Sequence, residues 1–127
     1  MAPEAFAVRV EFYREEEGAK PVAAFLREIN LSNPRLATRV KEELRQLQDR
    51  RYHGLPHTKA IVDQPGLFEL RVRGHDDVRV LYFFGAEREV VVVHAFVKKS
   101  QRIPTAELEV AMARKRRYER RHPGRAK

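Results

Sequence analysis

Two adjacent lysines end the most apolar segment of the sequence. Residues 90–104 read VVVVHAFVKKSQRIP, so Lys98 and Lys99 follow a hydrophobic run that is interrupted only by His94. This run is apolar on both faces, which predicts a central or well covered strand of a sheet. Ammonium groups fixed at the end of a strand have the chemistry to bind an anion. Neighbouring strand residues point to opposite faces, so only one of the two lysines is expected to face a given ligand.

Arginines form a second group of residues that can bind an anion. In the segment FELRVR, apolar residues alternate with Glu69, Arg71 and Arg73, and Arg79 lies between two valines in the segment DVRVLYFF. If the apolar residues of both segments share one face of a sheet, Arg79 lies on the other face with Glu69, Arg71 and Arg73. An unpaired guanidinium in an apolar strand is unfavourable. Two interpretations follow: an ion pair of Arg79 with Glu69 or Asp77, or binding of a phosphate group.

These residues require a sheet that brings several strands side by side. The spacing of apolar residues predicts the order β, α, α, β, β, β, α. The predicted elements are a strand around residues 6–10, helices over 21–29 and 35–50, strands over 68–73, 78–84 and 89–97, and a helix opened by Pro104. Residues 53–66 show no sustained period and are interpreted as a loop. The fold class is α+β, with an antiparallel-rich sheet packed by an N-terminal helical hairpin and a C-terminal helix.

The composition limits the class of protein. The chain has 127 residues, of which 43% are apolar and 35% charged, and this predicts a single globular domain over residues 1–127. No segment approaches the length of a membrane span and no export signal is visible, so a cytoplasmic protein without membrane contact is expected. The absence of cysteine excludes disulfides and thiolate zinc sites. The five histidines show no compact metal spacing, so no metal is expected.

The net charge of +8 is concentrated near the C-terminus. From Arg114 onward, lysine and arginine are opposed by Glu119 alone, and this segment is interpreted as a basic tail. Residues 35–59 hold a weaker excess of cations. Such clusters favour a polyanionic partner, with nucleic acid as the leading candidate, because cations that neutralise phosphates release condensed counterions. The other interpretation is a solvated helix end that contributes only solubility.

The motifs around these cations resemble those of a toxin family. The stretches GLFELRVRGHDDVRVLYFF and VVVVHAFVKKSQRIPTAELEVAMARKRRY closely resemble the phage-derived, HigB-like branch of the RelE/ParE toxin superfamily. The resemblance extends from Phe6 to Tyr118 and includes the helical hairpin. Two positions depart from the family pattern: Ala95 stands where the family favours glycine, and Ile103 replaces the threonine that usually caps the last helix.

The resemblance implies the toxin of a type II toxin–antitoxin system, in particular a ribosome-dependent mRNA endoribonuclease that inhibits translation. Such an enzyme uses neither metal nor cofactor: a 2′-hydroxyl group attacks the adjacent phosphate and leaves a cyclic phosphate. The expected partners are mRNA, the ribosome and a cognate antitoxin with a helix-turn-helix domain. Two alternatives stay open. One is a ParE-like inhibitor of DNA gyrase, which would not need the arginine cluster, and the other is a non-toxic binding module that has kept the fold.

The resemblance also implies roles for individual residues. Arg79 matches the arginine at the scissile phosphate, and Lys98 or Lys99 matches the basic pair at the end of the last strand. The further residues expected to bind RNA are Arg71, Arg73, His94, Arg102, Arg116 and Arg117. The general acid or base stays open, since family members use different residues. His94 and His75 are two candidates, with a core position for His94 and a solvated turn for His75 as the alternative interpretations.

Overall fold

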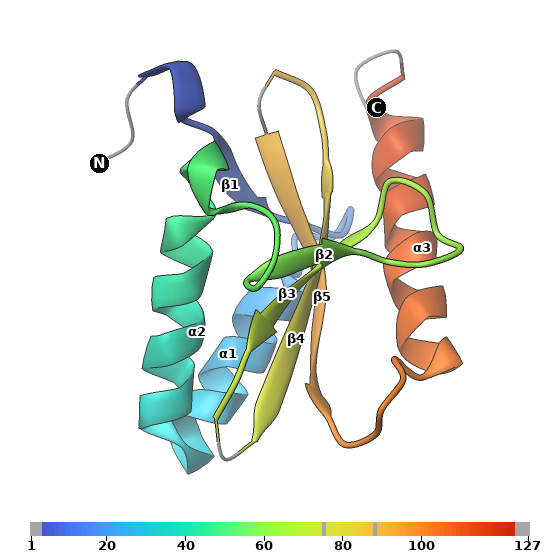
Figure 1. The fold of residues 1–127 in the computed structure, drawn as a ribbon. Helices are drawn as coiled ribbons and strands as arrows, with labels where there is room; N and C mark the ends of the chain where they lie inside the picture. Colours follow the sequence, from blue (N-terminus) through green and yellow to red (C-terminus); the bar gives the residue numbers. More distant parts are fainter. Residues whose placement is uncertain (1–3, 75, 88, 124–127) are drawn as a thin grey trace.

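The protein folds around one five-stranded sheet (Figure 1). The computed structural model describes residues 4–74, 76–87 and 89–123. The strands are β1 (Arg9–Phe12), β2 (Thr58–Ala60), β3 (Phe68–Val72), β4 (Asp77–Phe84) and β5 (Glu89–Lys98), in the spatial order β1-β5-β4-β3-β2. β1 pairs in parallel with β5, and the other neighbours are antiparallel. The predicted α+β class and the inner position of β5 are confirmed.

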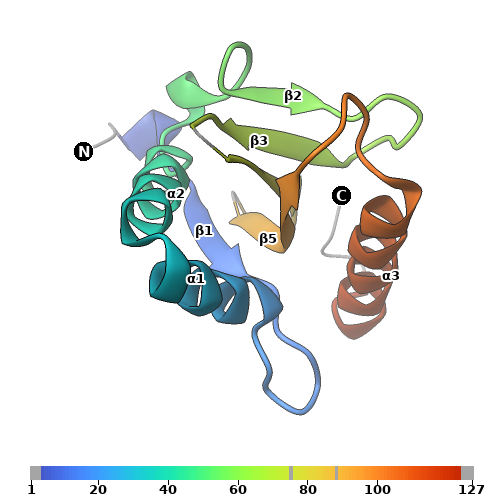
Figure 2. The same cartoon turned by 90° about the horizontal axis from the view of Figure 1, so that it is seen from below.

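In the described ranges, three α-helices cover the two faces of the sheet. They are α1 (Pro21–Ser32), α2 (Pro34–Gln46) and α3 (Thr105–Arg121), and short 3-10 helices span Glu4–Phe6 and Arg50–Tyr52. Proline begins both α1 and α2, at a position where its missing N–H costs nothing, and the Asn33 side chain caps α2 by accepting from the Leu36 N–H at 3.2 Å. Figure 2 shows α1 and α2 together on one side of the sheet and α3 on the other. The predicted helical hairpin and C-terminal helix are therefore confirmed.

Each face of the sheet has its own hydrophobic core. Toward α1 and α2, the buried residues include Val22, Leu26, Val40, Leu44, Leu70, Val80 and Tyr82. Toward α3, they include Leu81, Phe83, Val91, Val93, Ala111 and Tyr118. Both faces of β4 and β5 are thus covered, which explains why these two strands are so apolar. A charged side chain buried on either strand is therefore unfavourable unless a partner or a ligand compensates its charge.

Two details of the strand prediction are wrong. Phe6 lies in the first 3-10 helix, and the first strand begins only at Arg9. The segment interpreted as a loop contains β2, which pairs with β3 so that Lys59 lies opposite Glu69. A strand of three residues is too short to show an alternating pattern, and the surrounding prolines and glycines hid it.

The segment interpreted as a basic tail is helical as far as Arg121. Tyr118 anchors it: the ring is buried and meets Phe83 edge-on, with ring centroids 5.1 Å apart. The Tyr118 hydroxyl donates to Glu89 at 2.7 Å. Gly85 leaves the space for this contact, because a Cβ at that position would lie 2.5 Å from the hydroxyl oxygen. The end of α3 is therefore fixed to the sheet by specific packing.

Candidate functional site

Arg79 is the buried cation at the centre of the candidate site. It lies in β4 between Val78 and Val80, whose side chains pack toward α1 and α2, so its own side chain lies on the α3 face of the sheet. The residue is only 5% exposed. Arg71 lies directly opposite Arg79 in the β3–β4 pairing, and Glu69 is on the same face of β3. The predicted grouping of these charged residues on one face is confirmed.

The Arg79 guanidinium is close to two carboxylates but is hydrogen-bonded to neither. Its Nε lies 3.7 Å from Glu69 Oε1, and its Nη1 lies 3.8 Å from Asp77 Oδ2. Both distances exceed those of a hydrogen bond. Glu69 Oε1 instead accepts from Arg71 Nε at 2.9 Å. Nε and Nη1 of Arg79 are buried and have no hydrogen-bond partner in the part of the chain that the structure describes.

The charge on Arg79 persists in this environment. Burial lowers the pKa of the Arg79 guanidinium, and the negative charges of Glu69 and Asp77 act in the opposite direction. An arginine nevertheless stays protonated at neutral pH, because its ordinary pKa is so high. The site therefore presents a permanent buried positive charge with unsatisfied donors. Such a group is suited to bind an anion with several acceptor oxygens.

Lys98 shares the face of the sheet with Arg79. It lies opposite Asp77 in the β4–β5 pairing, and Asp77 is two residues from Arg79 on the same strand. The Lys98 ammonium donates to the Gln101 carbonyl oxygen at 2.9 Å, which holds it at the start of the β5–α3 loop. Lys99 follows the end of β5 and is exposed. The structure thus distinguishes the two lysines that the sequence left equivalent.

Two adjoining hollows, of about 610 and 720 Å³, open beside Arg79. Arg71, Arg79, Lys98 and Gln101 line both of them. The other charged residues that line one or the other are Lys59, Asp63, Glu69, Arg73, Asp77, Lys99 and Arg102. Cations outnumber carboxylates, so the hollows attract anions. Six of the residues predicted for the site, Arg71, Arg73, Arg79, Lys98, Lys99 and Arg102, are brought together here.

Lys59 is the cation lining these hollows that the sequence analysis missed. It lies on β2 opposite Glu69, and residues paired across strands share a face, so its side chain lies on the same face as Arg79. Recognising it required knowing that β2 exists.

Among the described residues, no group of three or more histidines or carboxylates could hold a metal ion. No helix in the described ranges is long and apolar enough to cross a membrane.

His94 lines neither hollow and lies beneath α3. Its Nε2 is 2.6 Å from Glu107 Oε1, and its Nδ1 is 3.1 Å from Arg114 Nη1. These contacts fit a neutral ring that donates through Nε2 and accepts through Nδ1. Both ring nitrogens are therefore used to attach α3 to β5. A contact of His94 with RNA stays a prediction, and His75 lies outside the described residues.

His94 is expected to make the protein less stable in acid. Burial lowers the pKa of His94 from its ordinary value of 6.5, although the Glu107 hydrogen bond opposes this shift. As the pH falls below 6.5, the unfolded chain takes up this proton first, so the free energy of unfolding decreases. The loss is complete once the pH is below the folded-state pKa. The free energy of unfolding is measured by urea unfolding at about pH 7.5 and about pH 5.5. The difference between the two values should be smaller in His94→Gln than in the parent protein.

The control for this measurement is His57→Gln, which changes a histidine stacked on Tyr52 at a ring distance of 3.9 Å. Part of the decline should remain in His94→Gln, because burial lowers the pKa of His53 as well. The same pH dependence in the parent protein and in His94→Gln would contradict the prediction.

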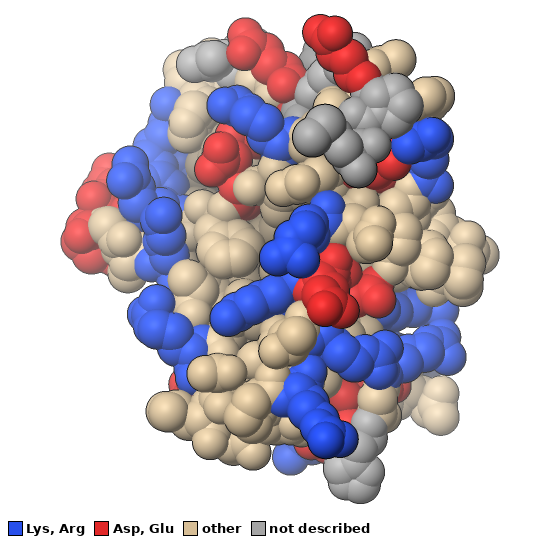
Figure 3. Space-filling model, turned by 90° about the vertical axis from the view of Figure 1, so that its left-hand side faces the viewer, with Lys and Arg blue, Asp and Glu red and all other residues tan. Residues whose placement is uncertain are grey.

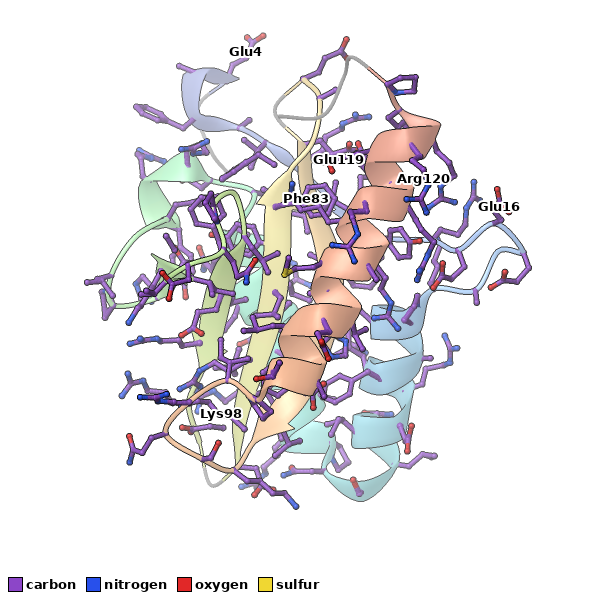
Figure 4. The ribbon with its side chains drawn as sticks, turned by 90° about the vertical axis from the view of Figure 1, so that its right-hand side faces the viewer. Glu4, Glu16, Phe83, Lys98, Glu119 and Arg120 are labelled. Atoms are coloured by element: carbon purple, nitrogen blue, oxygen red, sulfur yellow. The ribbon has the colours of Figure 1, made fainter. Side chains whose placement is uncertain are left out.

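The cations of α3 do not line the two hollows, and several of them are engaged within the protein. Figure 4 shows Lys98 beside the β5–α3 loop and Arg120 toward the other end of α3, near Glu16. Arg117 Nη2 lies 3.1 Å from Glu15 Oε2, and Arg117 Nε donates to the Tyr13 hydroxyl at 3.2 Å. Arg116 is exposed. The structure does not bring Arg116 and Arg117 to the hollows, so RNA contacts by these two residues stay predictions.

The protein is a small α+β protein with two adjoining hollows, lined mainly by cations, on the α3 face of its sheet. We call these two hollows together the cationic hollow. The family described as Phage derived protein Gp49-like (DUF891) matches residues 25–116, a range that includes Arg79, both lysines and most of α3. The chain therefore belongs to the phage-derived Gp49-like family. This membership is compatible with a toxin of a toxin–antitoxin system. A comparison with curated proteins gives no match.

Proposed function

We propose that the protein is the toxin of a type II toxin–antitoxin system and a HigB-like endoribonuclease that cleaves translated mRNA on the ribosome. The observation that carries this proposal is the Arg79 guanidinium, which is buried and lines the cationic hollow together with Lys98. Two of its nitrogens have no hydrogen-bond partner among the described residues. A buried donor without a partner is unfavourable unless a ligand uses it. The oxygens of a phosphodiester are acceptors that match a guanidinium in charge and geometry.

The proposed reaction needs only charge stabilisation and two proton transfers. The 2′-oxygen of one nucleotide attacks its own 3′-phosphorus, and the bond from phosphorus to the 5′-oxygen of the next nucleotide breaks. A base takes the proton of the attacking hydroxyl, and the departing oxygen receives a proton, so the products are a cyclic phosphate and a free 5′-hydroxyl. Arg79 and Lys98 stabilise the negative charge that grows on the phosphate oxygens. The attacking 2′-hydroxyl selects RNA over DNA.

The surrounding residues have supporting roles in this proposal. Arg71, Arg73 and Arg102 hold the phosphates on either side of the scissile bond, because they line the hollows that contain Arg79. The protein's other proposed partners are the ribosome that presents the mRNA and a cognate antitoxin with a helix-turn-helix domain. An antitoxin that covers the cationic hollow would keep RNA from entering it.

The test is an mRNA cleavage assay with purified protein and translating ribosomes. We expect cleavage within the translated region, new 3′ ends that carry a cyclic phosphate, and no cleavage where a 2′-deoxynucleotide replaces the nucleotide before the scissile bond. A DNA gyrase assay runs in parallel. Trapped gyrase–DNA complexes without mRNA cleavage would contradict the proposal in favour of a gyrase inhibitor, and inactivity in both assays would favour a binding module.

A further inference from the structure

The solvent side of α2 carries four cations outside the candidate site. Arg35, Arg39, Lys41 and Arg45 are all exposed, and we call these four residues the α2 ridge. Figure 3 views the molecule from the side of α2 and shows lysine and arginine side chains across this face. The two carboxylates of the helix, Glu42 and Glu43, offset only half of these four charges.

The cations of the α2 ridge differ from those of α3 in their ion pairs. None of the four forms an ion pair with any residue that the structure describes. On α3, by contrast, Arg114 and Arg117 pair with Glu15, and Lys115 pairs with Glu119 at 2.7 Å. α3 is the more basic helix in sequence, but its cations largely hold the fold together. All four cations of the α2 ridge lack an ion pair with a described residue, whereas on α3 only Arg116, Arg120 and Arg121 do.

The α2 ridge is continuous with the candidate site. Arg39 Nη1 lies 3.6 Å from the point where a side chain at Gly74 would place its Cβ. The Arg39 side chain therefore reaches the turn between β3 and β4. Arg73 directly precedes that glycine, is exposed, and lines the hollow that contains Arg79 and Lys98. A band of cations therefore runs from Arg35 and Arg39 around the end of β3 to the site.

The composition of the α2 face indicates what kind of partner fits it. Apart from Pro34 at the first position, the exposed residues of α2 are charged or polar. Protein interfaces normally place apolar or aromatic side chains at their centre, and this face has none. A sugar–phosphate backbone needs no such anchor, because cations and polar groups bind its phosphates without reading the bases.

We propose that the α2 ridge binds the phosphate backbone of a structured RNA and so positions the cationic hollow on its substrate. This inference rests on the proposed function, because it treats the ridge as the docking surface of the same RNA-directed protein. It assigns docking to α2, whereas the sequence alone pointed to the basic end of α3.

The test compares two double variants that remove the same charge. Arg35→Gln/Arg39→Gln changes the α2 ridge, and Arg14→Gln/Lys20→Gln changes two exposed cations in the segment between β1 and α1. Binding of each protein to a mixed-sequence RNA duplex and to ribosomes is measured over a range of salt concentrations. Each phosphate contact contributes about 0.9 to the slope of log affinity against log salt, so the ridge variant should lose nearly two from that slope and on the order of tenfold to a hundredfold in affinity. The control variant should bind as the parent does.

Three results would overturn the proposal. Equal losses in both double variants would show that only the overall charge matters. An unchanged slope in the ridge variant would show that α2 does not touch phosphates. Loss of binding to a polyglutamate peptide but not to RNA would identify an acidic protein segment as the partner. Failure of the proposed function is separate: a parent protein that binds RNA through the ridge but cleaves no mRNA would refute the nuclease and keep the docking surface.

Discussion

Replacing Arg79 with alanine is expected to reduce ribosome-dependent mRNA cleavage by about a hundredfold to a thousandfold, the usual cost of removing one preorganised donor from a charge-stabilising site. The effect should be on cleavage and not on docking, because the α2 ridge and the other cations of the hollow remain. The measurement is single-turnover cleavage of mRNA on ribosomes, together with sedimentation of the variant with ribosomes and a thermal melting curve.

The melting curve separates a catalytic role of Arg79 from a structural one. Breaking a tight buried ion pair costs about 3–5 kcal/mol because it leaves a charge without its partner. The Arg79 contacts with Glu69 and Asp77 are 3.7 and 3.8 Å long, and Glu69 keeps its hydrogen bond with Arg71 when Arg79 is removed. We therefore expect a much smaller loss of stability in Arg79→Ala. A folded variant that binds ribosomes and cleaves at the parental rate would refute the assignment.

Lys98→Ala is expected to reduce cleavage by about a hundredfold, because Lys98 supplies a further cation beside Arg79 on the same face of the sheet. Lys99→Ala is the matched variant: it removes an identical side chain one residue away, at an exposed position after β5. Its expected effect is about fivefold, the loss of one phosphate contact at physiological salt. Single-turnover cleavage measured side by side on the two variants gives the comparison.

The comparison also tests the register of the sheet. A larger loss in Lys99→Ala than in Lys98→Ala would contradict the placement of Lys98 opposite Asp77. Lys98→Arg completes the series, since it keeps the positive charge but changes the geometry of the donors. Partial recovery of cleavage in Lys98→Arg would identify charge as the main contribution of this residue.

The position of Arg79 was predictable because the pattern around it is strict. Each of β3 and β4 buries every second residue against α1 and α2, and a slip by one residue would turn all of them to the opposite face of the sheet. This constraint alone places Arg79 on the face opposite Val78 and Val80. The alternation does not reveal how tightly a charged group is paired, so the loose contacts of Arg79 emerged only from the structure.

The choice between Lys98 and Lys99 was not predictable, because β5 does not keep a single alternation. The β4–β5 pairing shifts between Leu81 and Tyr82, which is the mark of a β-bulge. Val91 and Val93 belong to the core under α3, and after the bulge Phe96 does so as well, so the parity of that face changes from odd to even residues. A strict alternation from Val91 would have placed Lys99 on the α3 face.

The contacts within the protein made by the basic end of α3 were not predictable for a different reason. Its ion-pair partner Glu15 and hydrogen-bond partner Tyr13 lie near the other end of the chain. A run of like charges is normally interpreted as a solvated surface, because no local pattern shows a distant carboxylate. The excess of cations on α2 was visible in the sequence, but the sequence did not show that these cations form no ion pair with the described residues.

The parallel pairing of β1 with β5 also constrains how the protein folds. Arg9 pairs with Glu89, so β1 can join the sheet only after β5, the last strand of the chain, is available. Contacts between distant parts of a chain form slowly, because the entropy of the long loop between them has to be lost first. During translation, the basic segments of β3 and β4 leave the ribosome before β5 does. A newly made chain therefore passes through an interval in which its cations are already synthesised but the sheet that carries Arg79 and Lys98 is not yet assembled.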